Sequence, residues 1–433
     1  MPVFLNSQNS DFEKEFKKLL SAKRENSVDV DLSVREIIDE VIERGDQALI
    51  EYTKRFDRIN LTSDKLRFTQ SELKEHAAKV SDQDHSALEL AVARIKAYHE
   101  KQLPDNAFWT DESGVELGWR WSPVAAAGLY VPGGLASYPS SVLMNAIPAK
   151  VAGVKRLAIT VPTPDNKINP MVLLAAQLSG VDEIYRIGGA QAIAALAYGT
   201  KTIEPVDKIT GPGNAFVAAA KRQVFGKVGI DMIAGPSEIL VIADKTSRPD
   251  WVALDLLSQA EHDENAQSIL ITDSDDLVKA VTEQVEINLK NLSRSEIAGK
   301  SWNHNGAIIK VTDFEMAAEL SNRIAPEHLE LCVSEPENLA KNISNAGAIF
   351  LGHWTPEAVG DYVTGPNHVL PTARSARFSS GLSVMDFLKR TTLAKVSRDA
   401  LLKLGPSAVT LANSEGLECH GLSISERMKS NSE

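Results

Sequence analysis

The chain has little of several features that mark particular protein classes. It holds only two cysteines, Cys332 and Cys419, in 433 residues. This excludes a disulfide framework and leaves a single disulfide as the weaker alternative to two free thiols. A reducing cytoplasm is the simplest location for such a chain. No apolar run reaches about 18 residues, so no membrane span is expected, and residues 1–9 lack the basic flank and apolar core of a signal peptide.

An excess of positive charge is also missing. Lysine and arginine number 46 against 58 aspartates and glutamates, which gives a formal net charge of −12. Without a basic stripe to neutralise phosphates, a nucleic-acid partner is not expected. The apolar content of 43% and the charged content of 24% are ordinary for a soluble globular protein. The length predicts more than one domain.

The N-terminal part of the chain, residues 1–123, reads as a mainly helical region. An amphipathic stretch covers residues 11–24, and Ser33 with Glu36 forms a candidate capping box. Another helix is expected over residues 82–101, before Pro104. Residues 109–121 alternate between apolar and polar side chains, which predicts a strand or hairpin. We expect part of this region to pack on the second of the two α/β units described next.

From residue 124 onward, short β-rich runs alternate with helical ones. This alternation predicts an α/β fold with mainly parallel sheets covered on both faces. We expect two doubly wound, Rossmann-like units over residues 124–235 and 236–386, which divide near Gly235 and Pro236. The tail, residues 387–433, reads as helical and too small for a core of its own. It is expected to pack on something else, with a second subunit as the candidate.

Three glycine-rich turns in the first α/β unit each follow a predicted strand and precede a helix. They cover residues 130–134, 188–191 and 211–214. None matches a Gly-x-Gly-x-x-Gly or Walker lysine pattern, and any one alone is more often a tight turn. Three together favour a dinucleotide crevice at the carboxyl ends of the strands, because backbone amides at helix starts attract phosphates.

Polar candidates for chemistry concentrate in the second unit. Gln259 and His262 lie three residues apart on one face of a predicted helix and could begin a metal site. A solvated helix edge is the commoner interpretation of such a pair. Glu327 and His328 precede a predicted strand and could divide acid–base work; two solvated loop residues are the equal alternative. Three further candidates are ambiguous alone, namely Asp361, His368 and Glu415. Cys419 beside His420 could indicate a thiolate, but a cysteine in a tail is more often inert.

Taken in order along the chain, these segments resemble the histidinol dehydrogenase family. The resemblance covers nearly the whole chain and is densest from about residue 128 to residue 420. The matching motifs are Gly-Leu-Tyr-Val-Pro-Gly-Gly, Gly-Gly-Ala-Gln-Ala-Ile-Ala-Ala-Leu-Ala-Tyr-Gly, Lys-Ile-Thr-Gly-Pro-Gly-Asn, Ala-Gly-Pro-Ser-Glu, Asp-Leu-Leu-Ser-Gln-Ala-Glu-His, Ala-Pro-Glu-His-Leu-Glu and Gly-Pro-Asn-His-Val-Leu-Pro-Thr.

The resemblance implies a zinc-containing, NAD-dependent oxidation of L-histidinol through L-histidinal to L-histidine, the last step of histidine biosynthesis. It implies one zinc per subunit, with Gln259, His262, Asp361 and His420 as ligands, and Glu327 and His328 as the acid–base pair. Positions implied to contact substrate are Ser237, Gln259, His262, His328, Asp361, His368, Glu415 and His420; those implied to contact NAD are Tyr130, Gln191 and Asn214.

The family also implies a homodimer in which the C-terminal segment crosses to the partner, so that Glu415 and His420 complete the neighbour's site. This agrees with a tail too small to fold alone. Two alternatives are weighed against this function. One is an NAD-dependent dehydrogenase of another small alcohol, such as a sulfonated diol. The other is a zinc hydrolase, which would need no glycine-rich crevice for NAD.

Overall fold

The computed structural model describes residues 1–21, 28–133, 138–233 and 235–430. The chain divides into two compact units. The first unit comprises residues 1–102 and 124–387, and the second comprises residues 103–123 and 388–433. No helix in the described ranges is long and apolar enough to cross a membrane.

Residues 124–233 of the first unit build a five-stranded parallel sheet with the order β6-β5-β4-β7-β8. Its strands are β4 (Ala126–Tyr130), β5 (Arg156–Thr160), β6 (Glu183–Tyr185), β7 (Lys208–Thr210) and β8 (Gly229–Ile230). The intervening helices are α6 (Pro139–Val151), α7 (Pro170–Leu178), α8 (Gly189–Tyr198) and α9 (Ala215–Val224). The strand order reverses between β4 and β7, which is the topological switch point of a doubly wound sheet.

Four N-terminal helices enclose this sheet. They are α2 (Val28–Arg44), α3 (Asp46–Asp57), α4 (Gln70–Ala77) and α5 (Asp82–Glu100). Helix α2 packs on α8 and α9, α4 packs on α7, and α5 packs on α6 and α7. Helix α4 begins at the capping box of Thr69 and Glu72, which satisfies two amides at its start.

Residues 235–387, joined by the N-terminus, build a second parallel sheet with the order β1-β11-β10-β9-β12-β13. Its strands are β1 (Val3–Asn6), β9 (Glu238–Ala243), β10 (Gln267–Thr272), β11 (Ala307–Lys310), β12 (His328–Cys332) and β13 (Ala348–Leu351). The helices are α1 (Phe12–Ser21), α10 (Pro249–Ala260), α11 (Asp275–Leu289), α12 (Ser295–Asn305), α13 (Phe314–Ile324), α14 (Pro336–Ala340) and α15 (Glu357–Tyr362). Short 3-10 turns lie at Ser63–Lys65, Pro164–Asn166, Ser375–Arg377 and Val384–Phe387.

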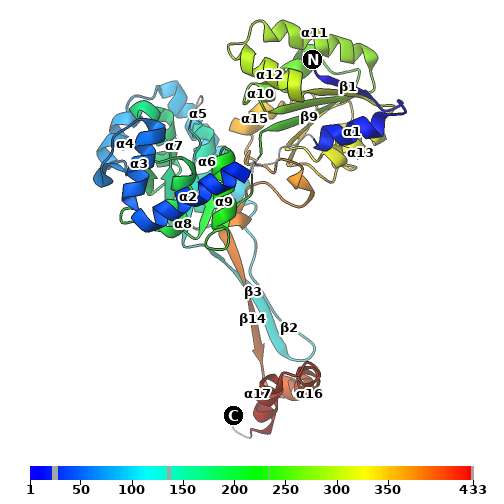
Figure 1. Ribbon diagram of the computed structural model, residues 1–433. Helices are drawn as coiled ribbons and strands as arrows, with labels where there is room; N and C mark the ends of the chain where they lie inside the picture. The colour runs from blue at the N-terminus through cyan, green and yellow to red at the C-terminus, as the bar shows by residue number, and fades with distance from the viewer. Residues whose placement is uncertain (22–27, 134–137, 234, 431–433) are drawn as a thin grey trace. The chain divides into compact units, whose positions relative to one another are not determined.

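Both faces of the second sheet are covered (Figure 1). All six residues of β9 are buried, as a continuous apolar strand in a doubly covered sheet requires. Leu240 and Ile242 pack with α1 and α13, whereas Ile239 and Val241 pack with α10, α11 and α12. Because successive side chains of a strand point to opposite faces, β9 contributes to the apolar core on each side of the sheet. The predicted α/β class, with two doubly wound parallel sheets, is confirmed.

The second compact unit is a three-stranded antiparallel sheet followed by two helices. Its strands are β2 (Ala107–Thr110), β3 (Val115–Pro123) and β14 (Leu388–Val396), and its helices are α16 (Arg398–Ser414) and α17 (Glu418–Lys429). The hairpin of β2 and β3 covers the stretch predicted as strand or hairpin. Residues 388–396 are expected to be helical but form a strand instead. The reason is tertiary, because β14 pairs with β3 over nine consecutive residues.

Candidate active site

The second parallel sheet carries His328 at the amino end of β12, between β9 and β13. His328 is 4% exposed. Its Nδ1 lies 2.9 Å from the carbonyl oxygen of Glu238. A carbonyl only accepts, so Nδ1 donates and the neutral ring carries its free lone pair on Nε2. Burial lowers the pKa of His328, which keeps the ring neutral, although the Asp361 carboxylate opposes this.

Helix α15 faces the free nitrogen of His328 with two carboxyl groups. Glu357 Oε1 lies 3.7 Å from Nε2 and Asp361 Oδ1 lies 4.0 Å from it. Neither distance is a hydrogen bond, and both Nε2 and Glu357 Oε1 are buried with no hydrogen-bond partner in the described part of the chain. Of these three residues, His328 and Asp361 line a cavity.

His368 joins the same group from the loop after α15. Its Nδ1 donates to the carbonyl oxygen of Asp361 at 3.1 Å and lies 3.6 Å from the Asp361 carboxylate. Its Nε2 lies 3.5 Å from Ser141 Oγ on α6. Because α6 belongs to the first sheet and His368 to the second half of the unit, the two α/β halves meet beside His368.

A cavity of about 520 Å³ opens at this point. His328, Asp361 and His368 line it, with Tyr98 and Asn367 among the other lining residues; Glu327 is not one of them. Glu327 is 7% exposed, and its Oε2 accepts the Glu238 amide at 2.9 Å. Burial and the Glu238 carboxylate raise the pKa of Glu327 well above its ordinary value.

Gln259 supplies the test of whether a metal fits. It lies near the carboxyl end of α10, is wholly buried, and neither its amide oxygen nor its amide nitrogen has a hydrogen-bond partner among the described residues. A buried amide without partners is costly, so this side chain calls for a ligand. Asp361 also belongs to a group whose donor atoms lie within 4.8 Å of one another, together with His328 and Glu357. Nitrogen and oxygen donors without a thiolate suit zinc or a harder cation.

The remaining predicted residues of the second half fall at the same edge of the sheet. Ser237 immediately precedes β9. His262 follows α10, and its side chain is reached by solvent. Nearby protein still lowers the pKa of His262 by desolvation, whereas the Asp361 carboxylate raises it. His262 and His368 each lower the pKa of His328, which indicates that these rings share one neighbourhood.

Glu415 and His420 are different, since they belong to the second compact unit. Glu415 caps the end of α16, His420 lies in the first turn of α17, and both are exposed. The structure brings together His328, Glu357, Asp361 and His368 without either of them.

The polar residues around His328 lie at the amino edge of the second sheet, where a functional site is not usually expected. Strand carboxyl ends are the usual site in parallel sheets, but His328 and Glu238 are the first residues of β12 and β9. Crossover helices end at this edge, and a helix carboxyl end carries partial negative charge. Helix α10, with twelve residues, ends beside Gln259. The amino edge therefore favours a cation.

The glycine-rich turns lie at the opposite kind of edge, the carboxyl ends of β4, β6 and β7. Tyr130 ends β4, and its hydroxyl accepts the Gly189 amide at 3.1 Å. Burial raises the pKa of Tyr130 to about 12, so the hydroxyl stays neutral. Gln191 is buried in the first turn of α8, and Asn214 caps α9 by accepting the amides of residues 216 and 217. Of the first turn, Gly134 lies outside the described residues.

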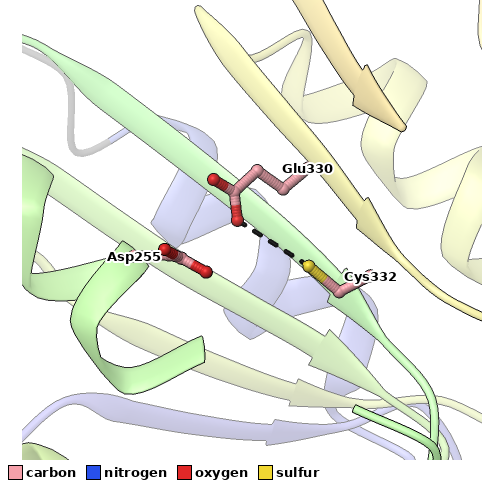
Figure 2. Close-up of side chains that lie close together, drawn as sticks. All are labelled: Asp255, Glu330 and Cys332. Atoms are coloured by element: carbon pink, nitrogen blue, oxygen red, sulfur yellow. Dashed lines mark hydrogen bonds between the residues drawn. The ribbon is translucent and has the colours of Figure 1, made fainter. Parts of the chain in front are cut away.

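The sequence did not indicate Glu357, nor a second cluster that contains two acidic residues and a cysteine. Glu357 was not singled out, because a lone glutamate in a short helix has no signal. The second group is Asp255, Glu330 and Cys332, whose side chains converge between α10 and β12 (Figure 2). His328, Glu330 and Cys332 alternate along β12 and so share one face, which is a signal that could have been found. Glu330 accepts the Glu357 amide at 2.5 Å, so it fixes the start of α15.

Comparisons with known proteins identify the family of the chain. The family model for histidinol dehydrogenase matches residues 20–428. The chain is 69% identical to the histidinol dehydrogenase of Ruegeria pomeroyi and 66% identical to that of Cereibacter sphaeroides, each over 428 residues and 99% of both chains. The crystal structure of histidinol dehydrogenase from Elizabethkingia anophelis matches with a TM-score of 0.94 and 38% identity, covering 99% of this chain and 98% of that one. With a matching family model over nearly its whole length and relatives this similar, the chain belongs to the histidinol dehydrogenase family.

Proposed function

We propose that this chain catalyses the four-electron, NAD-dependent oxidation of L-histidinol through L-histidinal to L-histidine. The observation that carries the proposal is the state of His328. Its Nδ1 is committed to the Glu238 carbonyl, and its Nε2 is a free base at a cavity that Asp361 and His368 also line. A neutral imidazole in this state can take a proton from an alcohol.

One zinc ion per subunit is held, in this proposal, by Gln259, His262 and Asp361 together with His420 of the partner subunit. The unpartnered, wholly buried amide of Gln259 supports it. When bound, the ion supplies a template that orients the imidazole and amino nitrogens of the substrate. Holding the carbinol carbon in place can contribute about 7 kcal/mol or more to lowering the barrier.

In the first oxidation, His328 Nε2 accepts the hydroxyl proton while the carbinol carbon loses a hydride, giving the aldehyde. In the second, the aldehyde must gain water, so that a hydride again leaves a tetrahedral carbon and the product is a carboxylate. Glu327 is proposed to activate that water. Burial raises its pKa, so the carboxylate, once it has lost its proton, is a stronger base than that of an ordinary glutamate. The oxidant in each step is NAD, which takes up the hydride.

NAD is proposed to lie along the carboxyl edge of the first sheet, against Tyr130, Gln191 and Asn214. Two features support this placement. The turns after β4 and β7 flank the switch point between these two strands, and the Gly189 amide of the third turn donates to the Tyr130 hydroxyl at the end of β4. The starts of α8 and α9 are the kind of helix terminus that suits a pyrophosphate. The 3.5 Å approach of Ser141 Oγ on α6 to His368 Nε2 supports a site that draws on both α/β halves.

The second compact unit is proposed to cross to the partner in a homodimer, where Glu415 and His420 complete the neighbour's site. Exposed apolar side chains on its helices support a covering partner, among them Leu402, Leu411 and Leu422. The cytoplasmic location expected from the two cysteines stays a prediction. Both are free, with Cys332 buried and Cys419 exposed.

The test is a stoichiometry. Purified protein is given limiting L-histidinol and excess NAD, and NADH is counted per substrate consumed. We expect two NADH per histidinol, with histidine as the product. One NADH would mean that the reaction stops at the aldehyde, and no reduction of NAD would overturn the proposal. A sulfonated diol tested in parallel should give no NADH. The zinc hydrolase alternative has no support from the family.

A further inference from the structure

A buried ion pair in the first sheet has no role in the function described so far. Lys221 lies in α9 and Asp231 follows β8, and their side chains are only 3% and 0% exposed. The two groups are in direct contact. Buried ion pairs contribute little net stability, because desolvation of both charges offsets their attraction. The position of the pair therefore needs another explanation.

The pair closes a ring of hydrogen bonds around one residue, Gly211. Asp231 Oδ2 accepts the Gly211 amide at 2.8 Å, and Lys221 Nζ donates to the Gly211 carbonyl at 3.0 Å. Both backbone groups of this glycine are thus held by the ion pair. Gly211 opens the turn of residues 211–214, directly after β7 and beside the switch point.

The conformation of Gly211 explains why it needs to be held. Its φ is +112°, a region that side-chain-bearing residues rarely adopt, and a Cβ there would lie 2.1 Å from the Tyr130 carbonyl oxygen. The turn thus runs against the end of β4. Three residues later, Asn214 begins α9, the same helix that carries Lys221. One lysine therefore connects the body of the helix with the turn that precedes it.

We propose that Lys221 and Asp231 are positioning residues for the cofactor, whose ion pair holds the Gly211–Asn214 turn in the conformation that receives the pyrophosphate of NAD. This inference rests on the proposed function. The charges fit the task, because the lysine neutralises a carboxylate that would otherwise repel phosphate from beneath the turn. Neither side chain needs to touch NAD, since both are buried.

The test compares two ligands that differ in the pyrophosphate. ADP-ribose carries it and adenosine does not. In Lys221→Met, we expect the dissociation constant of ADP-ribose and the KM for NAD to rise about tenfold or more, as loss of a charged hydrogen bond predicts. Adenosine binding, kcat and the KM for histidinol should stay near the wild-type values, because the substrate site lies on the other sheet.

Two further variants keep the test decisive. Lys221→Met leaves Asp231 buried and charged, which endangers folding. The double variant Lys221→Met with Asp231→Asn removes that charge and keeps an acceptor for the Gly211 amide, and it should also weaken ADP-ribose. Lys150→Met is the control for loss of a lysine–aspartate pair elsewhere in the same sheet. Lys150 pairs with Asp182 at 2.9 Å at the amino edge of the same sheet, and its loss should leave ADP-ribose binding unchanged.

The outcomes distinguish a failure of the proposed function from a failure of the positioning role of Lys221 and Asp231. If the wild-type protein neither binds ADP-ribose nor reduces NAD, the proposed function is wrong. If the wild type does both and a folded Lys221 variant binds ADP-ribose as tightly, the positioning role is overturned. Equal weakening of adenosine and ADP-ribose, or equal effects in the Lys150 variant, would also overturn it by indicating general loosening.

Discussion

Replacing His328 with asparagine tests the central chemical claim. The substitution removes the free Nε2 while an amide can still donate toward the Glu238 carbonyl, which the histidine holds at 2.9 Å. Neighbouring groups should keep their places, because β12 is fixed on both sides by parallel pairing with β9 and β13. The expected loss is therefore chemical rather than structural.

The magnitude follows from the role of a general base. Such a group contributes about 10²–10⁴ in rate, which corresponds to about 3–5 kcal/mol in the barrier. The structure favours the upper part of this range. Nε2 is buried, and the described residues provide no substitute base with an unpartnered nitrogen at the cavity. Glu357 Oε1 lies 3.7 Å from Nε2, closer than the 4.0 Å of Asp361 Oδ1.

The assay is single-turnover formation of NADH from histidinol, followed by absorbance over a range of pH. Burial lowers the pKa of His328, so the neutral base persists below the ordinary histidine value of about 6.5. In the wild type the rate should fall only below that pH, as the ring gains a proton. His328→Asn should be slow at every pH and lack this acid limb.

A matched control is His353→Asn. His353 lies in the same half of the first unit, contacts Thr246 through its Nε2 at 3.1 Å, and has no part in the proposed chemistry. It should keep the wild-type rate and pH profile. An unchanged single-turnover rate in His328→Asn, or an acid limb that survives the substitution, would remove His328 as the base.

Four other outcomes are expected. Glu327→Gln should slow aldehyde oxidation more than alcohol oxidation in separate half-reaction assays, and equal losses would count against the hydration role. Mixed dimers of His420→Asn and Glu327→Gln subunits should recover part of the complete oxidation of histidinol to histidine that each variant alone has lost, whereas verified heterodimers without this recovery would speak against shared sites. Gln259→Met should lower the zinc content measured by mass spectrometry yet not lower the Tm of the zinc-free protein, because the buried amide it removes is unpartnered; a drop in that Tm would contradict this. In Cys419→Ser, no thiol should react with a disulfide reagent before denaturation, because Cys332 is buried and burial raises its pKa; a fast-reacting thiol would show that the cluster around Glu330 is open.

The sequence by itself determined the fold class and the family. Alternating strand and helix periods required parallel sheets covered on both faces, and the apolar run of β9 shows why, since each of its faces is buried. The glycine-rich turns could be located because glycine is demanded where backbone meets backbone, as at Gly211 against Tyr130. The pairing of residues 388–396 with β3 escaped prediction, because that partner lies more than 260 residues away and local propensity does not encode it.

Only the tertiary structure decided what the polar residues do together. The free nitrogen of His328 depends on a hydrogen bond to Glu238, 90 residues earlier in the chain. The hydrogen bonds that hold Gly211 come from two side chains in different parts of the chain, Lys221 and Asp231. Spacing along the chain carries no information about such contacts. The contacts of His328 arise because β9, β12 and α15 bring residues to the amino edge of the second sheet, where helix carboxyl ends favour a cation. Those of Gly211 arise because α9 and the segment after β8 meet the end of β7 in the first sheet. Sequence supplies the groups, and packing sets the distances and protonation states on which their chemistry depends.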